Sequence, residues 1–231
     1  PSATGARRGR ALKLVVKHGM EHWGRPNAWV YVPSSFDPAK KNLHVVVLFR
    51  GFKNCIDSYV SLHGIPCTMG QPARTGYDVA KQVERSGTGA IVVLPELAFD
   101  QPNAYPGELG SPGGFRAFLK ELVEESLSPV IGAHKYEDID RVALFASSGG
   151  YQALLPAINY GEVDTIRDIY LMDAYYVDNA AMTGFIKDHV ADFSPNADPA
   201  RTIAAKTAFL IIVSPSFAWR APSCAIFPQP A

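Results

Sequence analysis

The sequence predicts an α/β protein: a mostly parallel sheet covered by helices on both faces, with an antiparallel strand pair at its N-terminal end. Two observations carry this prediction. Strands buried on both faces are near-continuous apolar runs, and five such runs occur, at 43–49, 90–94, 142–145, 169–172 and 208–213. Segments with helical periodicity lie between and after them, at 77–85, 114–127, 150–159 and 180–190.

The antiparallel pair comes first in the chain. Residues 12–17 and 28–32 are short alternating or β-branched runs, and the segment between them contains the turn residues Gly19, Gly24 and Pro26. Two such runs separated by turn residues predict neighbouring antiparallel strands.

The domain organisation is simple. The chain has 231 residues, 47% hydrophobic and 19% charged, which is ordinary for a globular protein with one core. We expect a flexible N-terminal arm at 1–11, one domain at 12–213, and an irregular tail at 214–231 that contains four prolines.

Charge and composition exclude several function classes. Lysine plus arginine equals aspartate plus glutamate at 22 each, so we expect no nucleic-acid partner. No apolar stretch approaches the roughly 18 residues that span a bilayer, so we expect no membrane span. His18 and His22 are four residues apart, but Gly19 and the strand context spoil the geometry of a helical metal pair. We therefore expect no metal and no cofactor, and the sequence makes no prediction of the oligomeric state.

Three cysteines are present, and two of them flank one loop. Cys55 and Cys67 are expected to lie close enough to be bridged, with Cα atoms within about 7 Å. Two interpretations remain open, a disulfide or a pair of reduced, partly buried thiols. A disulfide would favour a secreted or periplasmic location, and without it the sequence assigns no compartment. Cys224 lies in the tail.

A serine lies between the apolar run 142–145, the fifth expected strand counted from the N-terminus, and the helical segment 150–159. In the segment Ala146-Ser147-Ser148-Gly149-Gly150, small residues stand two before and two after Ser148. A sharp strand-to-helix turn needs small residues at these two positions, because strand and helix pass closely there. If Ser147 were at the apex instead, Phe145 would occupy the first tight position. Ser148 is therefore the candidate nucleophile, in a strained backbone conformation.

Other candidate residues follow neighbouring strands. Ligands of open α/β sheets bind at the carboxyl ends of the strands, where Arg50-Gly51-Phe52 and Asp173 are expected to converge with Ser148. The loops 51–78 and 95–113 are long and irregular, which is typical of binding loops. Glu96 and Asp100 follow the fourth strand, and are either an acid–base pair or part of a solvated or salt-bridged loop. Aromatic residues in or beside these loops favour an apolar or aryl acyl group, or belong to the core; they are Phe52, Tyr59, Tyr105, Tyr151 and Tyr175.

These features resemble the α/β-hydrolase superfamily, whose nucleophile elbow Gly-x-Ser-x-Gly follows the fifth strand. The chain looks most like secreted esterases, in which a His-Gly pair follows the third strand and Gly-His-Ser-Gly-Gly-Tyr forms the elbow. Arg50 stands here in place of that histidine, and Ala146-Ser147 in place of Gly-His. The resemblance implies an acyl-enzyme on Ser148, with the backbone N–H groups of Gly149 and of Phe52 or Gly51 as the oxyanion hole.

The resemblance also implies an orienting acid and a base. Members carry the acid after the sixth or the seventh strand, and Asp173, after the sixth, is the candidate; a helix cap or loop hydrogen bond is its alternative role. Members carry the base histidine after an eighth strand, and residues 214–231 contain no histidine. His189 is the only histidine after Ser148, and is either the base or a surface residue of the helical segment 180–190. We expect no histidine within hydrogen-bond reach of Ser148.

Two functions follow from these residues. The first is a serine hydrolase that acts on a small-molecule carboxylic ester through Ser148, with a base that is supplied irregularly or lost. The second is a non-catalytic protein of the same fold that binds a ligand or a partner. The elbow favours the first function, and the missing histidine favours the second.

Overall fold

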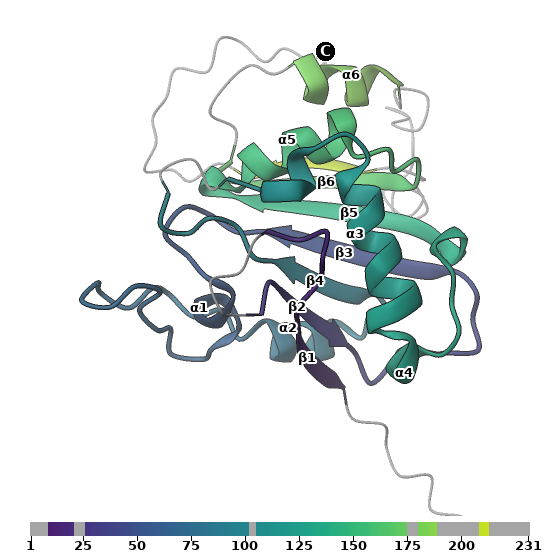
Figure 1. The fold of residues 1–231 in the computed structure, drawn as a ribbon, viewed down its shortest axis with the longest axis horizontal. Helices are drawn as coiled ribbons and strands as arrows, with labels where there is room; N and C mark the ends of the chain where they lie inside the picture. The colour runs from purple at the N-terminus through teal and green to yellow at the C-terminus, as the bar shows by residue number, and fades with distance from the viewer. Residues whose placement is uncertain (1–8, 21–25, 102–104, 175–179, 189–207, 213–231) are drawn as a thin grey trace, which may run out of the picture.

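A single sheet organises the part of the chain that the computed structural model describes, residues 9–20, 26–101, 105–174, 180–188 and 208–212 (Figure 1). Its order is β1-β2-β4-β3-β5-β6-β7. The strands are β1 (Arg10–Leu14), β2 (Ala28–Val32), β3 (Leu43–Phe49), β4 (Ile91–Pro95), β5 (Ile139–Ser147), β6 (Ile166–Met172) and β7 (Ala208–Ile212). Strand β2 pairs antiparallel with β1 and β4, and the other four pairings are parallel. The predicted fold class and N-terminal antiparallel pair are confirmed.

Helices connect the strands. The described helices are α1 (Ile56–Val60), α2 (Val79–Ser86), α3 (Gly114–Glu121), α4 (Ser128–Ile131), α5 (Tyr151–Tyr160) and α6 (Ala180–Asp188). Short turns join them; they are η1 (Gly107–Gly110), η2 (Leu122–Ser126), η3 (Tyr136–Asp138) and η4 (Ser148–Gly150). The sequence predicted α2, α3, α5 and α6 to within a few residues, except that η2, a π turn, follows α3 inside the predicted helix 114–127. It missed α1, which lies in the loop after β3.

Alternate residues of one strand show that both faces of the sheet are covered. In β2, Val30 belongs to a large buried cluster that contains Phe115 of α3 and Leu154 of α5. Its neighbour Trp29 belongs to a second cluster that contains Val83 of α2. Successive side chains of a strand point to opposite faces, so α3 and α5 cover one face and α2 covers the other (Figure 1).

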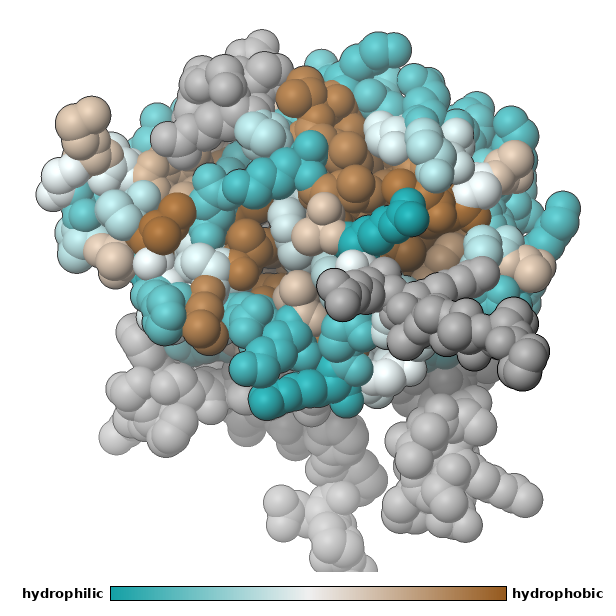
Figure 2. All heavy atoms as spheres, turned by 90° about the horizontal axis from the view of Figure 1, so that it is seen from below, coloured by the Kyte–Doolittle hydropathy of each residue, from teal (hydrophilic) through white to brown (hydrophobic). Residues whose placement is uncertain are grey.

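Strand β1 forms one edge of the sheet and is less buried than the central strands. Its residues alternate between exposed and half-buried, as expected of an edge strand with one face on the core. Viewed from this side, brown apolar side chains lie among teal hydrophilic ones (Figure 2). Beyond the strand, Val15 is 61% exposed. Among the described residues, the longest apolar helical segment is too short to cross a membrane.

Candidate active site

The turn between β5 and α5 places Ser148 in an unusual backbone conformation. Strand β5 ends at Ser147, and Ser148 begins η4 with a φ of 48°. A non-glycine residue with positive φ is uncommon, and such residues cluster at functional sites. The predicted strand-to-helix turn with strain at Ser148 is confirmed.

Small residues on either side of Ser148 allow this turn. Ala146 is fully buried. A Cβ at Gly150 would lie 2.2 Å from the carbonyl oxygen of Phe49 and 2.9 Å from that of Arg50. The end of β3 therefore passes directly against the turn, and only a glycine leaves room for it.

The loop after β3 meets the turn at two glycines. A Cβ at Gly51 would lie 2.9 Å from the Cβ of Ser148 and 3.5 Å from its Oγ, and one at Gly149 would lie 3.3 Å from the backbone nitrogen of Phe52. The structure thus brings together Gly51, Phe52, Ser148 and Gly149, as the sequence predicted. Within the described part of the chain, the N–H of Phe52 donates to no other residue.

Tyr59 of α1 also reaches this point. Burial raises the pKa of Tyr59, while the neighbouring Ser147 side chain and Gly51 backbone act in the opposite direction. Its hydroxyl therefore lies beside the residue that precedes Ser148 and the residue that precedes Phe52. Its ring packs on Tyr77, with centroids 4.6 Å apart.

Asp173 lies at the same edge of the sheet as Ser148. Strands β5 and β6 are parallel neighbours, with Ser147 opposite Met172. Ser148 directly follows Ser147 and Asp173 directly follows Met172, so the two residues leave neighbouring strands at the same level of the sheet. Asp173 is half-buried and has a φ of 51°. This place suits an orienting acid, and that role stays a prediction.

The described histidines lie elsewhere. Three of them pair with carboxylates other than Asp173: His18 with Glu108, His44 with Asp140 and His134 with Asp138, at N···O distances of 3.9, 3.5 and 3.4 Å. His63 is exposed in the loop after α1. None of these four histidines hydrogen-bonds to Ser148. His189, like His22, lies outside the described residues, so the expected absence of a base histidine near Ser148 stays a prediction.

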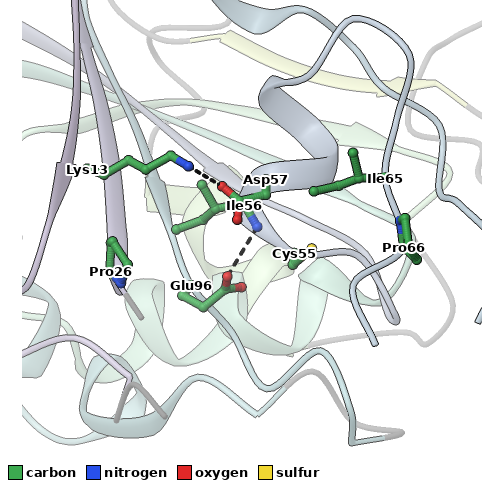
Figure 3. Close-up of a pocket in the computed structure, with 8 residues that line it drawn as sticks. All are labelled: Lys13, Pro26, Cys55, Ile56, Asp57, Ile65, Pro66 and Glu96. Atoms are coloured by element: carbon green, nitrogen blue, oxygen red, sulfur yellow. Dashed lines mark hydrogen bonds and ion pairs between the residues drawn. The ribbon is translucent and has the colours of Figure 1, made fainter. Parts of the chain in front are cut away.

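A buried ion pair lies beneath the loop after β3. Arg50 is completely buried, and its Nη2 donates to Oε1 of Glu96 and to the carbonyl oxygen of Leu97. The other carboxylate oxygen of Glu96 accepts the backbone N–H of Ile56 at 3.1 Å (Figure 3). Burial raises the pKa of Glu96 and lowers that of Arg50, and their mutual attraction opposes both shifts. Of the two roles considered for Glu96, the structure shows the salt-bridged one.

The expected bridge between Cys55 and Cys67 is confirmed. Their Cα atoms are 5.6 Å apart and the sulfur atoms are bonded. Cys55 is the residue before α1, so the disulfide holds the start of this helix against the loop that follows it. Cys55 and Glu96 line a cavity of about 270 Å³. Lys13 of β1 and Asp57 of α1 also line it, and these two side chains pair at 2.6 Å (Figure 3).

Sequence reasoning missed the Arg50–Glu96 pair, and it named Tyr59 only as one of several aromatic residues in or beside the binding loops or in the core. A signal for the pair was present, because Arg50 and Glu96 each follow a buried strand directly, and these two strands, β3 and β4, are parallel neighbours. The position of Tyr59 in a long loop indicated a place at the site, but not its contact with the turn, since the fold of the loop decides where the side chain lies. Among the described residues, His, Cys, Asp and Glu form no group of three that could hold a metal ion.

Comparison with known proteins supports the fold. No protein-family model matches the chain, and no curated protein matches it in sequence. It is similar to a feruloyl esterase module from Clostridium thermocellum, solved as a complex with sinapinate, at 12% identity and a TM-score of 0.51 over 89% of this chain and 81% of that one. A ferulic acid esterase is 17% identical, with a TM-score of 0.39 over 88% of this chain and 78% of that one.

At such identities the similarity shows the fold. The chain has the α/β-hydrolase fold, as the feruloyl esterase module does, so the fold that the resemblance implied is confirmed. The roles of single residues do not follow from it.

Proposed function

We propose that this protein is a serine hydrolase that cleaves a carboxylic ester through an acyl-enzyme on Ser148. The observation that carries the proposal is the meeting of a strained serine with a backbone donor that has no acceptor among the described residues: Ser148 has a φ of 48°, and Phe52 N lies beside Gly149, the next residue. A nucleophilic serine needs backbone donors aimed at the oxyanion that forms next to it. The esterase fold of the Clostridium thermocellum module supports the same chemistry.

The donors of the oxyanion hole are the N–H groups of Phe52 and Gly149. Gly51 is the other candidate; its backbone acts to lower the pKa of the neighbouring Tyr59 hydroxyl, so Phe52 is preferred. The N–H of Phe52 has no acceptor among the described residues, so it is available to an oxyanion. Asp173 is the proposed orienting acid, His189 the first candidate for the base, and a neutral ester with an apolar or aryl acyl group the substrate.

The alternative is a protein of the same fold that binds a ligand or partner without turnover. One observation favours it: none of the four described histidines contacts Ser148. Without a base the serine hydroxyl stays protonated and reacts slowly. The disulfide supports a secreted or periplasmic location for either function.

Covalent labelling separates the two functions. We expect a fluorophosphonate to modify native wild-type protein on Ser148, far faster than it modifies free N-acetylserine, as read by intact mass and peptide mapping. Ser148→Ala should not be labelled, whereas Ser35→Ala, which removes an exposed hydroxyl after β2, should be labelled at the wild-type rate. Folded wild-type protein that reacts no faster than N-acetylserine contradicts the hydrolase and supports the binding protein.

Asp173→Asn tests the orienting acid. If His189 supplies the base, an amide at position 173 keeps the shape of the carboxylate but cannot hold the imidazolium, so the labelling rate should fall by about 100-fold or more. Asp140→Asn is the matched control, because Asp140 pairs with His44 at the opposite end of β5. Equal rates for Asp173→Asn and wild type would restrict Asp173 to a structural role.

A further inference from the structure

The loop that would supply the oxyanion donor is held at both ends by one carboxylate. Arg50, directly before Gly51 and Phe52, donates to Oε1 of Glu96. Ile56, the first residue of α1, donates its backbone N–H to Oε2 of the same residue at 3.1 Å. Glu96 thus joins the residues on either side of the segment 51–55, which we call the donor loop.

Glu96 is itself well fixed. It follows β4 directly and is 7% exposed, and the backbone N–H of Leu97 donates to its Oε1 at 3.2 Å. Because β4 is a buried strand of the sheet, the carboxylate is a rigid reference for the donor loop.

A second connection links Glu96, through α1, to the turn that carries Ser148. Helix α1, whose first turn is held by Glu96, carries Tyr59, and the Tyr59 hydroxyl lies beside the Gly51 backbone and the Ser147 side chain. Glu96 therefore restrains the donor loop at both of its ends. Through α1 and Tyr59 it also restrains the loop at Gly51, beside the turn that carries Ser148.

Stability does not explain this ion pair. Well-packed apolar residues of similar volume often replace a buried ion pair without loss of stability, because both charges must be stripped of water. In addition, Nε and Nη1 of Arg50 are buried without a hydrogen-bond partner among the described residues, so the pair is incompletely satisfied there. The pair does fix positions, since it joins the residue after β3, the residue after β4 and the first residue of α1 at defined atoms.

We propose that Glu96 is a positioning residue that, through Arg50 and the N–H of Ile56, holds the donor loop so that the N–H of Phe52 faces the oxyanion formed at Ser148. This inference rests on the proposed function. Glu96 does not touch substrate in it, and its effect passes through the backbone of the loop.

Two variants separate positioning from structural support. Glu96→Gln keeps the shape of the side chain and removes its charge. The double variant Arg50→Met/Glu96→Leu removes both charges and fills the space with apolar atoms, so it should keep a thermal unfolding midpoint close to that of wild type. Glu84→Gln is the matched control, because Glu84 also accepts several hydrogen bonds, from Ser34 and Tyr31, but lies on α2 away from the donor loop.

The measurements are the saturating rate and half-saturation concentration of fluorophosphonate labelling, and amide hydrogen exchange over 50–56. Loss of one oxyanion donor costs about 10²–10³-fold in rate, so we expect the saturating rate to fall about 100-fold in both variants. The half-saturation concentration should change less than threefold, exchange over 50–56 should accelerate, and Glu84→Gln should match wild type.

The outcomes keep this proposal apart from the proposed function. If wild type is labelled and the stable double variant is labelled within threefold of it, Glu96 is not a positioning residue. If wild type is not labelled, the hydrolase is contradicted; exchange over 50–56 then decides whether Glu96 holds the donor loop, and unchanged exchange in both variants overturns that as well.

Discussion

Gly150→Ala is expected to lower the free energy of unfolding by about 3 kcal/mol and to abolish labelling of Ser148. The added Cβ would lie 2.2 Å from the carbonyl oxygen of Phe49, 2.8 Å from its carbon and 2.9 Å from the carbonyl oxygen of Arg50. All three atoms belong to the backbone at the end of β3, so no side chain can rotate away. Either β3 or the turn must move, and both hold the candidate active site. Urea unfolding followed by circular dichroism measures the first effect, and fluorophosphonate labelling the second.

Gly184→Ala is the matched control. Within the described part of the chain, a Cβ at Gly184 would meet no atom within 4 Å, and the residue lies within α6. Alanine is the better helix former, so this variant should be as stable as wild type or more stable by about 0.5–1 kcal/mol. A Gly150→Ala protein with wild-type stability and labelling would show that β3 does not press against the turn.

The turn around Ser148 could be predicted because its constraints are local. Four residues within the segment 146–150, Ala146, Ser148, Gly149 and Gly150, carry the small-residue spacing of a sharp strand-to-helix turn, and the apolar run before them identifies the strand. The strands themselves were predicted for the same reason, since burial on both faces leaves a continuous apolar run. Their boundaries were less certain: β5 begins at Ile139, three residues before the expected run.

The support of the site could not be predicted in the same way, because it depends on contacts between distant segments. Arg50 and Glu96 are 46 residues apart, and although each directly follows a buried strand, this position does not say that its side chain is buried. Helix α1 is a single short helix in a loop without clear periodicity, and its start is defined by contacts with Glu96 and with the disulfide. Tyr59 reaches the turn only because α1 is there.

Removal of the disulfide is expected to lower the free energy of unfolding by about 3 kcal/mol. Cys55 and Cys67 are separated by 12 positions, and the bond restricts the unfolded chain by closing this loop. Both residues are buried, with Phe99 in the same small cluster. The measurement is urea unfolding of Cys55→Ser/Cys67→Ser against its parent, both in a Cys224→Ala background so that the third thiol cannot exchange. Reduction of the parent with a phosphine should give the same loss.

The disulfide is also expected to influence the reactivity of Ser148, because Cys55 is the last residue of the donor loop and directly precedes α1. The bond fixes the residue directly before Ile56, whose N–H binds Glu96 at 3.1 Å. Without it, the first turn of α1 has one fewer restraint, and labelling of Ser148 should slow at temperatures where the variant is still folded.

The control is treatment of Cys55→Ser/Cys67→Ser with the same phosphine, which should change neither the stability nor the labelling of this variant. Equal unfolding midpoints for the oxidised and reduced parent would contradict the loop-closure argument. A large loss of stability with unchanged labelling would confine the disulfide to the stability of the fold, and leave Glu96 as the residue that holds the donor loop in place.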